Sequence, residues 1–482
     1  MTAGRSLPQT WRTRLARPWA DRTGRTAQAH AASPLAAQDR AAGPWHRAGR
    51  LLPGLALACL ALAACEREVI LEGERLDPRA LTRAGAPDVP PNRALPVALT
   101  APVDHSAWTH RGGSPTHRIA HPALPATLGV AWSTNIGDGA SRRMRITADP
   151  VAADGRVFTL DAHSTVTATG RDGRILWQTD IRPGWAGRGI ASGGGLALGA
   201  GRLFVTSAYG ALMALDPASG DVIWSKRFEA PLTAPPAVAE GRVFVVGTDG
   251  TGWAIDAGTG QVQWQLPGVP ASAGMVGGAG PAVAGGRAIL PFATGDVVGV
   301  AAATGVQSWR SRVAGQRLGR TGALVSDIAG DPVVVDGTVF VGNRSGRLMA
   351  LDAATGAVRW SVREGAFGPV WPAGDSLFMI SDRGELLRLQ ARDGARVWGV
   401  ELGHFLPARE RRRAETVAHF GPVLAGGRLI VASSDGLLRS FDPASGALLS
   451  ETALPGPAAS RPVVVERTLY LVTRDGRLHA LR

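Results

Sequence analysis

The sequence predicts an all-β protein, an eight-bladed β-propeller of four-stranded antiparallel blades that is closed by an N-terminal strand completing the last blade. The first observation is a unit of roughly 40 to 50 residues that recurs along the chain, a period typical of propeller blades. Its eight copies start at Gly155, Gly201, Gly241, Gly286, Gly337, Gly374, Gly427 and Glu466. The second observation is a tryptophan four residues after a glycine at the end of most copies. These tryptophans are Trp177, Trp224, Trp264, Trp309, Trp360 and Trp398.

The copy Gly201–Trp224 shows how one blade is built. An apolar run at Leu203–Val205 and a second run ending at Leu215 predict two strands, and Asp216–Gly220 has the Asp-Pro and Gly chemistry of a turn before the next strand. Such a sheet buries both faces only against neighbouring copies. The turn aspartate recurs in the copies as Asp216, Asp256, Asp352 and Asp442. We interpret it as structural, because a catalytic residue would be singular.

The repeated tryptophan is predicted to fill the gap between neighbouring sheets, where small side chains would leave voids. The seventh copy has Ser450 in the tryptophan position, and the eighth stops at Arg482 without a final strand. Residues 128–136, which contain Trp132, precede the first copy and have the pattern of a free strand. This strand is expected to complete the last blade, because an unpaired edge invites aggregation.

Charge and cysteine content limit the classes of function. The net charge is +13, but residues 1–64 hold nine arginines against two aspartates, so most of the excess belongs to the N-terminal region. We therefore predict no nucleic-acid partner. The two cysteines, Cys59 and Cys65, both precede the propeller, which excludes disulfides and cysteine metal sites within it.

Residues 1–64 are expected to be a signal peptide with an over-long N-terminal extension. Basic residues precede an apolar run of about 14 residues, too short to span a bilayer. The run ends in Leu62-Ala63-Ala64-Cys65, which closely matches the lipobox of bacterial lipoproteins. Cys65 is thus the predicted lipidation site, and acyl chains on it would anchor the protein to a membrane. The alternative is an ordinary signal peptide in which Cys65 is incidental.

Residues 65–127 are predicted to form a lipidated tether, and residues 128–482 the propeller. The tether is Pro-rich and has too few periodic apolar residues to fold alone. It contains four histidines, at positions His105, His110, His117 and His121. Their spacing matches no closed metal site, so a packing or strand-capping role is favoured over metal binding.

The repeat core, as in LDAATGAVRW at Leu351–Trp360, strongly resembles the repeat of pyrroloquinoline-quinone (PQQ) propellers. Two families share this repeat: the quinoprotein dehydrogenases and the BamB-like lipoproteins of outer-membrane protein assembly. The dehydrogenases commonly have a vicinal cysteine pair at the cofactor, which this chain lacks. A PQQ-dependent dehydrogenase-like quinoprotein is therefore the alternative function, and we predict no enzyme activity, no cofactor and no metal.

The BamB-like resemblance covers nearly all of the chain after Cys65. It includes the segment Ser326–Val341, the C-terminal region with Ser450, and a lipobox followed by a tether. The resemblance implies a non-catalytic scaffold of the outer-membrane β-barrel assembly machinery. Such a protein is a monomer within a complex, lipid-anchored at the periplasmic face of the outer membrane. A generic periplasmic protein-binding propeller remains a further alternative.

In the BamB-like family, loops of the central blades bind a POTRA domain of the barrel-inserting protein BamA. The resemblance places this contact at Met275 and Val276, before the fourth blade, and at Asp327, before the fifth. The family usually has an arginine at position 276 and a second acidic residue at position 329. A basic insertion, Arg409–Arg413, lies between the sixth and seventh blades, and is either a solvated loop or a contact for anionic lipid or an acidic partner.

Overall fold

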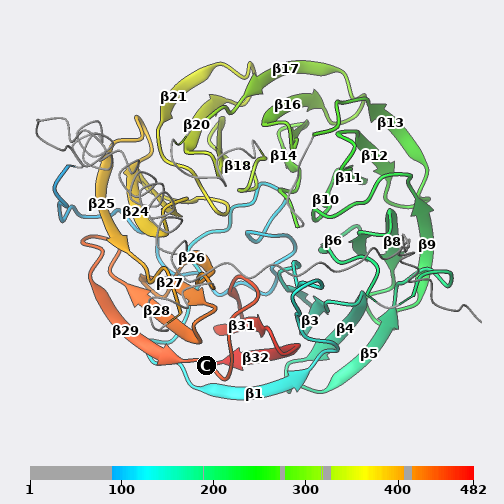
Figure 1. The fold of residues 1–482 in the computed structure, drawn as a ribbon, viewed down its shortest axis with the longest axis horizontal. Coiled ribbons are helices and arrows are strands. Elements are labelled where there is room, and N and C mark those ends of the chain that lie inside the picture. Colours follow the sequence, from blue (N-terminus) through cyan, green and yellow to red (C-terminus); the bar gives the residue numbers. More distant parts are fainter. Residues whose placement is uncertain (1–89, 188, 272–276, 316, 318–326, 407–414) are drawn as a thin grey trace, which may run out of the picture. The chain divides into compact units, whose positions relative to one another are not determined.

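The structure, a computed structural model, describes residues 90–187, 189–271, 277–315, 317, 327–406 and 415–482, and every regular element among these residues is a β-strand. The strands form eight separate four-stranded antiparallel sheets arranged as the blades of a ring (Figure 1). Within a blade the strands follow one another from the axis outward, in chain order in blades 1 to 7. The predicted eight-bladed propeller is confirmed.

The strands of blades 1 to 4 are β2 (Val151–Ala153), β3 (Arg156–Leu160), β4 (Thr165–Gly170), β5 (Ile175–Asp180); β6 (Gly194–Gly199), β7 (Arg202–Ser207), β8 (Ala211–Leu215), β9 (Val222–Arg227); β10 (Ala237–Ala239), β11 (Arg242–Val246), β12 (Gly252–Asp256), β13 (Val262–Leu266); β14 (Ala282–Ala284), β15 (Arg287–Pro291), β16 (Asp296–Ala301), β17 (Gln307–Arg312). Those of blades 5 to 8 are β18 (Val333–Val335), β19 (Thr338–Asn343), β20 (Arg347–Asp352), β21 (Val358–Val362); β22 (Trp371–Ala373), β23 (Ser376–Ile380), β24 (Glu385–Gln390), β25 (Arg396–Glu401); β26 (His419–Ala425), β27 (Arg428–Ser433), β28 (Leu437–Phe441), β29 (Leu448–Ala453); β30 (Val463–Val465), β31 (Thr468–Thr473), β32 (Arg477–Leu481), β1 (Val130–Asn135).

Blade 8 is assembled from both ends of the propeller sequence. Its strand order is β30-β31-β32-β1, and β1 pairs antiparallel with β32 from Val130 opposite Leu481 to Asn135 opposite Arg477. Trp132 of β1 takes the position that the repeated tryptophan occupies in other blades. All eight blades thus have four strands.

Burial explains why the inner and outer strands differ in sequence. The three inner strands of a blade are packed on both faces, so β7 reads as the continuous run RLFVTS and is almost wholly buried. The outer strand faces solvent at the rim, and β5 alternates buried and exposed side chains around Trp177. This division repeats in the other blades.

Each repeated tryptophan connects its blade to the next one. The indole Nε1 donates to a backbone carbonyl of the following blade, with distances of 2.8 to 3.2 Å, for Trp132, Trp177, Trp224, Trp264, Trp309, Trp360 and Trp398. The ring lies on a turn glycine of that blade; a Cβ on Gly446, for example, would stand 2.8 Å from the Trp398 ring. The glycine also has a positive φ of 77°. The tryptophans therefore fill the gaps between sheets, as predicted.

Ser450 occupies the tryptophan position at the one blade interface that lacks this glycine turn. In blade 8 the fourth strand is β1, which is far from β32 in sequence, so no turn joins the third strand to the fourth. A tryptophan on blade 7 would have neither the glycine nor the carbonyl to contact. The exception in the repeat follows from how the ring is closed.

The ring has two unlike faces, because antiparallel strands place alternate connections on opposite sides. We call the side with the turns between first and second and between third and fourth strands the turn face. The side with the turns between second and third strands and the connections between blades is the loop face. Turn aspartates of the turn face, such as Asp352, accept backbone amides two and three residues ahead, here at 3.0 Å, which confirms their structural role.

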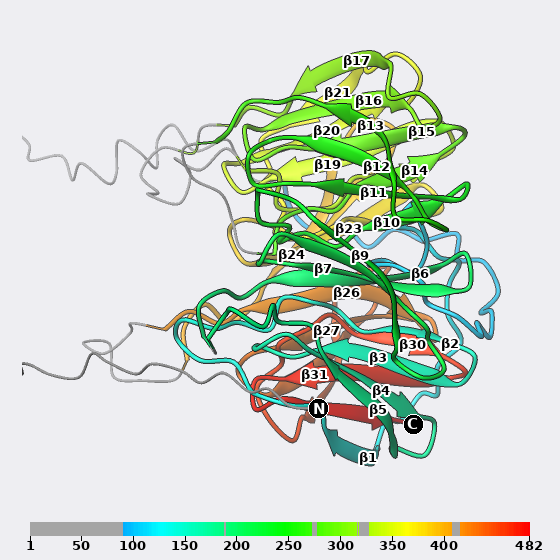
Figure 2. The same ribbon diagram turned by 90° about the vertical axis from the view of Figure 1, so that its right-hand side faces the viewer.

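Residues 90–127, assigned to the tether by the sequence, run against the turn face and into the middle of the ring, and we call them the hub segment (Figures 1 and 2). The inner edges of the blades donate backbone amides to it. The donors are Ala152, Leu198, Val238, Val283, Val334, Gly426, Gly427 and Glu466, which come from seven blades. The remaining blade, the sixth, contributes Trp371, whose ring stacks on Trp108 with centroids 6.2 Å apart. The hub segment thus covers the inner strand edges that the axis would otherwise leave unpaired.

The hub histidines bond to backbone groups. His110 Nε2 accepts the amide of Val238 at 2.8 Å, and His117 Nδ1 donates to the carbonyl of Pro332 at 2.8 Å. Burial, together with the nearby charge of His117, lowers the pKa of His110 to about 3. These contacts fit the packing role, and no group of three or more metal-binding side chains occurs among the described residues.

Candidate partner-binding surface

The sites that the sequence predicted for a partner all belong to connections of the loop face. Met275 and Val276 fall between β13 and β14, and Arg409–Arg413 between β25 and β26; these residues lie outside the described part of the chain. Cys65 also lies outside it. Asp327 precedes β18 and is described. Of these predicted residues the structure places Asp327 alone, in the loop-face connection before β18.

Large apolar side chains are exposed on this face. They sit in four connections between blades and comprise Trp185, Ile190, Val269, Phe367 and Phe405. Trp185 is 61% exposed and rests edge-on against Tyr209, with Arg227 lying 5.1 Å from the centre of its ring. Val269 belongs to the same connection as Met275. Exposed apolar side chains within polar surroundings are typical of protein-binding surfaces.

A cavity of about 490 Å³ opens at the axis of the loop face. Its wall combines arginines (Arg111, Arg344, Arg383, Arg461) with Asp149, Asp382, His404, His419 and the rings of Phe367 and Phe420. Arg111 reaches this cavity from the hub segment. The hub segment therefore contributes one side chain to the wall of this cavity.

Buried ion pairs fix the floor of the cavity. The Arg111 guanidinium lies 3.3 Å from Asp149 and 3.1 Å from Asp331, and Arg461 lies 3.0 Å from Asp149. Burial alone would raise the pKa of Asp331, but the neighbouring Arg111, with His117 and Arg461, more than offsets this and lowers it. The two arginines and two carboxylates balance in charge. They hold the inner ends of three blades and the hub segment in one arrangement.

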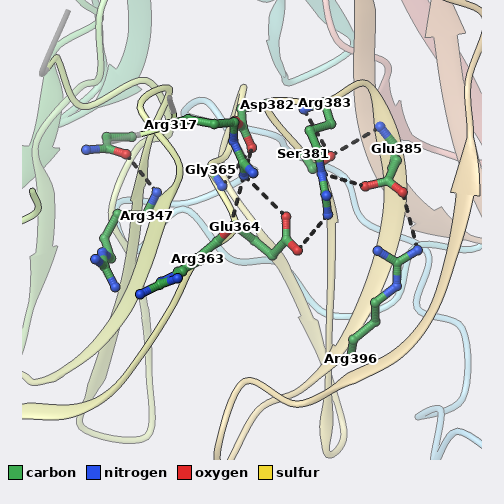
Figure 3. A network of polar contacts seen from close by, with 11 residues as sticks. Arg317, Arg347, Arg363, Glu364, Gly365, Ser381, Asp382, Arg383, Glu385 and Arg396 are labelled. Atoms are coloured by element: carbon green, nitrogen blue, oxygen red, sulfur yellow. Dashed lines mark hydrogen bonds and ion pairs between the residues drawn. The ribbon is translucent and has the colours of Figure 1, made fainter. Parts of the chain in front are cut away.

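A second polar network lies between blades 5 and 6 at the rim of the cavity (Figure 3). Three arginines alternate with three carboxylates, in the order Asp382, Arg317, Glu364, Arg383, Glu385 and Arg396. Arg317 Nη2 lies 2.8 Å from Asp382 Oδ1, and Arg383 Nη2 lies 2.8 Å from Glu364 Oε1. Burial raises the pKa of Glu364, although the adjacent Arg383 and Arg317 oppose this shift. The network ties Arg317, in the connection before blade 5, to the second-to-third-strand turn of blade 6.

Asp327 lies deeper than a direct contact residue would. Its exposed fraction is 5%, and the following residue, Ile328, bridges to Asn343 of β19. Burial lowers the pKa of Arg344, and the negative charge of Asp327 counteracts this. Arg344 in turn lies 5.0 Å from the centre of the Phe367 ring. The structure thus links Asp327 to an exposed aromatic side chain through Arg344.

Neither the Arg317–Arg396 network nor the Arg111 cluster could be predicted from sequence. The paired residues are far apart in the chain, with 65 positions between Arg317 and Asp382 and 220 between Arg111 and Asp331. One signal was available: Asp382-Arg383 stands in a short turn at which the other copies carry different residues. No helix of the described residues is long and apolar enough to cross a membrane.

Eight four-stranded blades, joined by tryptophans that lie on glycine turns, define a β-propeller built from PQQ-like repeats. The family described as outer membrane protein assembly factor BamB matches residues 162–400 and 404–482. The chain belongs to this family.

Individual relatives agree with this assignment. The chain is 27% identical over 376 residues to outer membrane protein assembly factor BamB of Salmonella typhimurium, covering 76% of this chain and 91% of the relative. The protein of the same name from Shewanella oneidensis is 25% identical, covering 74% and 90%.

Solved structures share the fold. BamB from Moraxella catarrhalis superposes with a TM-score of 0.60 at 20% identity, covering 74% of this chain and all of that one. A europium-containing methanol dehydrogenase reaches a TM-score of 0.58 at 14% identity, covering 78% of this chain and 98% of that one. At these identities the likeness shows the propeller architecture.

Proposed function

We propose that this chain is a non-catalytic scaffold of the outer-membrane β-barrel assembly machinery, and that its loop face binds a POTRA domain of a BamA-like protein. The observation that carries the proposal is the membership of the BamB family together with the cluster of exposed apolar side chains on the loop face. The chain aligns with about nine-tenths of the length of relatives that are named as assembly factors, and this supports the same role.

The loop face offers the composition that a protein interface needs. Trp185, Val269, Phe367 and Phe405 supply apolar contact area, and the arginines and carboxylates of the Figure 3 network supply a polar rim. Interface energy concentrates on a few aromatic and arginine anchors. We place Met275 and Val276 in this surface, and Asp327 acts there through Arg344 and Phe367.

The proposed address is the periplasmic face of the outer membrane, with Cys65 as the lipid-bearing residue. Lipid chains on Cys65 would keep the propeller close to a membrane-embedded partner. The protein would then work as a monomer within the assembly complex, without a cofactor.

The test is binding of the purified full-length chain to the POTRA region of the BamA-like protein from the same bacterium, measured by biolayer interferometry. The double variant Phe367→Asp/Phe405→Asp should weaken binding about tenfold or more. The matched control is Val222→Asp/Ile223→Asp, which alters exposed residues of the outer strand β9. Absence of binding by the unaltered chain, or equal loss in both variants, would contradict the proposal; capture of a cell-wall enzyme instead would favour a generic binding propeller.

A further inference from the structure

Grooves run between adjacent blades on the turn face. Each one lies between the first turn of one blade and the last turn of the next. The hub segment occupies two of these grooves, and so shows which chemistry they accept.

The groove between blades 6 and 7 holds Leu95 and Pro96 of the hub segment. The Leu95 amide donates to the carbonyl of Ala444 at 3.2 Å. The Arg388 guanidinium donates to the carbonyls of both Leu95 and Pro96, the latter at 2.9 Å. Arg388 is 2% exposed and stands at the sequence position that small residues such as Ala350 occupy in most other blades. In this groove, a buried arginine therefore donates hydrogen bonds to the backbone carbonyls of an extended segment.

The groove between blades 7 and 8 holds Leu124 and Pro125. Leu124 is 8% exposed and packs in the core, and the Arg428 guanidinium donates to the carbonyl of Pro125. Both occupying segments have the sequence Ala-Leu-Pro, at residues 94–96 and 123–125. Two neighbouring grooves thus bind the same three-residue motif, each with an arginine on its carbonyl oxygens.

The groove between blades 4 and 5, the blade 4–5 groove, has the same parts, and of the hub segment only Thr116 lines it. It is a cavity of about 420 Å³ whose apolar lining comprises Ala284, Ile289, Val334, Ala353 and Ala354. Its charged side chains balance, with Arg287 and Arg359 against Asp336 and Asp352. Arg359 Nη2 lies 2.7 Å from Asp352 Oδ2. A cavity with an apolar lining and balanced charges fits an extended peptide with apolar side chains.

Arg287 is the arginine of this groove. It is the first residue of its blade's second strand and follows a glycine. Arg428 and Arg202 have the same position in their own blades. Arg202 donates to the carbonyls of Ala257 and Gly258 in the next blade. Within the described part of the chain, the Nε of Arg287 is buried and has no hydrogen-bond partner. A buried donor without an acceptor is costly, and a peptide carbonyl would satisfy it.

We propose that the blade 4–5 groove binds an extended Leu-Pro segment of a partner protein. The leucine enters the apolar lining, the proline keeps the segment extended, and Arg287 donates to a carbonyl oxygen. Proline lowers the entropy that such a segment loses on binding, as in other proline-rich recognition. The site lies on the turn face, opposite the POTRA-binding surface proposed above, and does not depend on it.

The probe is a fluorescent octapeptide with the sequence of residues 93–100, RALPVALT, and its binding to the full-length chain in detergent is followed by fluorescence polarisation. We expect saturable binding that Arg287→Ala weakens about tenfold or more. Ala354→Trp, at an exposed position of the groove, should block binding by filling the cavity. The matched control Arg202→Ala removes an arginine that already bonds to its own chain, and should leave the peptide affinity unchanged.

Thermal unfolding of each variant checks that the propeller is intact. Peptide binding that survives both Arg287→Ala and Ala354→Trp would overturn the proposal, as would the absence of saturable binding to the unaltered chain. A peptide with Asp and Gly in place of its Leu-Pro pair should not bind, and equal binding of this peptide would also overturn it. The Phe367→Asp/Phe405→Asp variant should bind the octapeptide normally, so the outcome is independent of the POTRA test.

Discussion

The guanidinium of Arg111 in the hub segment lies 3.1 Å from the carboxylate of Asp331, immediately before blade 5, and both side chains are almost fully buried, with 5% and 0% exposure. The pair joins residues 220 positions apart in sequence. Asp331 also accepts the amide of Gly280 from the connection before blade 4 at 2.6 Å. One carboxylate thus joins the hub segment to two neighbouring blades.

Removing Arg111 should strongly destabilise the propeller. Arg111→Ala leaves Asp331 without its main counter-charge in a buried position, and breaking such a pair costs about 3 to 5 kcal/mol. The measurement is the free energy of unfolding in urea. Arg118→Ala, at an exposed position of the same segment, is the control and should change stability by less than about 0.5 kcal/mol. Similar values for the two variants would show that the pair contributes little.

Stability should fall as the pH drops below about 6.5. The pKa of buried His110 is about 3 in the folded state against an ordinary value of 6.5, so the unfolded chain binds a proton that the folded chain does not. Burial shifts the pKa of His117 in the same direction. The stability that neutral, buried His110 contributes is fully present well above pH 6.5, and it decreases as the pH falls towards 3.

For His110 alone, the loss between pH 7 and pH 5 is on the order of 2 kcal/mol. Urea unfolding at these two pH values measures it. His110→Asn should retain an acceptor for the Val238 amide and show a smaller loss between the two pH values. An unchanged pH dependence in this variant would assign the effect to other groups.

Replacing a tryptophan that packs between blades should lower the free energy of unfolding more than replacing a tryptophan on the surface. Trp398 is fully buried, donates to Pro443 and lies on Gly446, so Trp398→Ala should cost about 3 to 5 kcal/mol through cavity formation. Trp185→Ala, on the exposed loop face, should change stability little. Thermal and urea unfolding compare the two variants, and an equal cost would contradict the role assigned to the repeated tryptophan.

Lipid attachment should depend on Cys65 alone. Metabolic labelling with palmitate should be lost in Cys65→Ser and kept in Cys59→Ser, because only Cys65 ends the lipobox sequence. Membrane fractionation should follow the same pattern. Labelling of Cys65→Ser would contradict the anchor, and loss in both variants would point to a failure of export.

The repeat made the propeller predictable, since each copy carries its own strands, turn aspartate and tryptophan. It also located the loops before blades 4 and 5. The hub segment was not predictable, because its partners are backbone amides at the edges of strands, which leave no periodicity in either sequence. The network of Arg317 with Asp382 was not predictable for a related reason. In the sequence each charged residue resembles an ordinary surface residue, and only the folded chain brings the loops together.

The pairing of β1 with β32 imposes an order on the biogenesis of the ring. Ser133 in β1 bonds to His479 in β32, 346 residues later. β1 therefore has no partner strand until the far end of the propeller sequence is available to fold. Until then β1 and the inner strand edges are open to other chains. Closing the ring is thus the step that covers the last unpaired strand edge of the propeller.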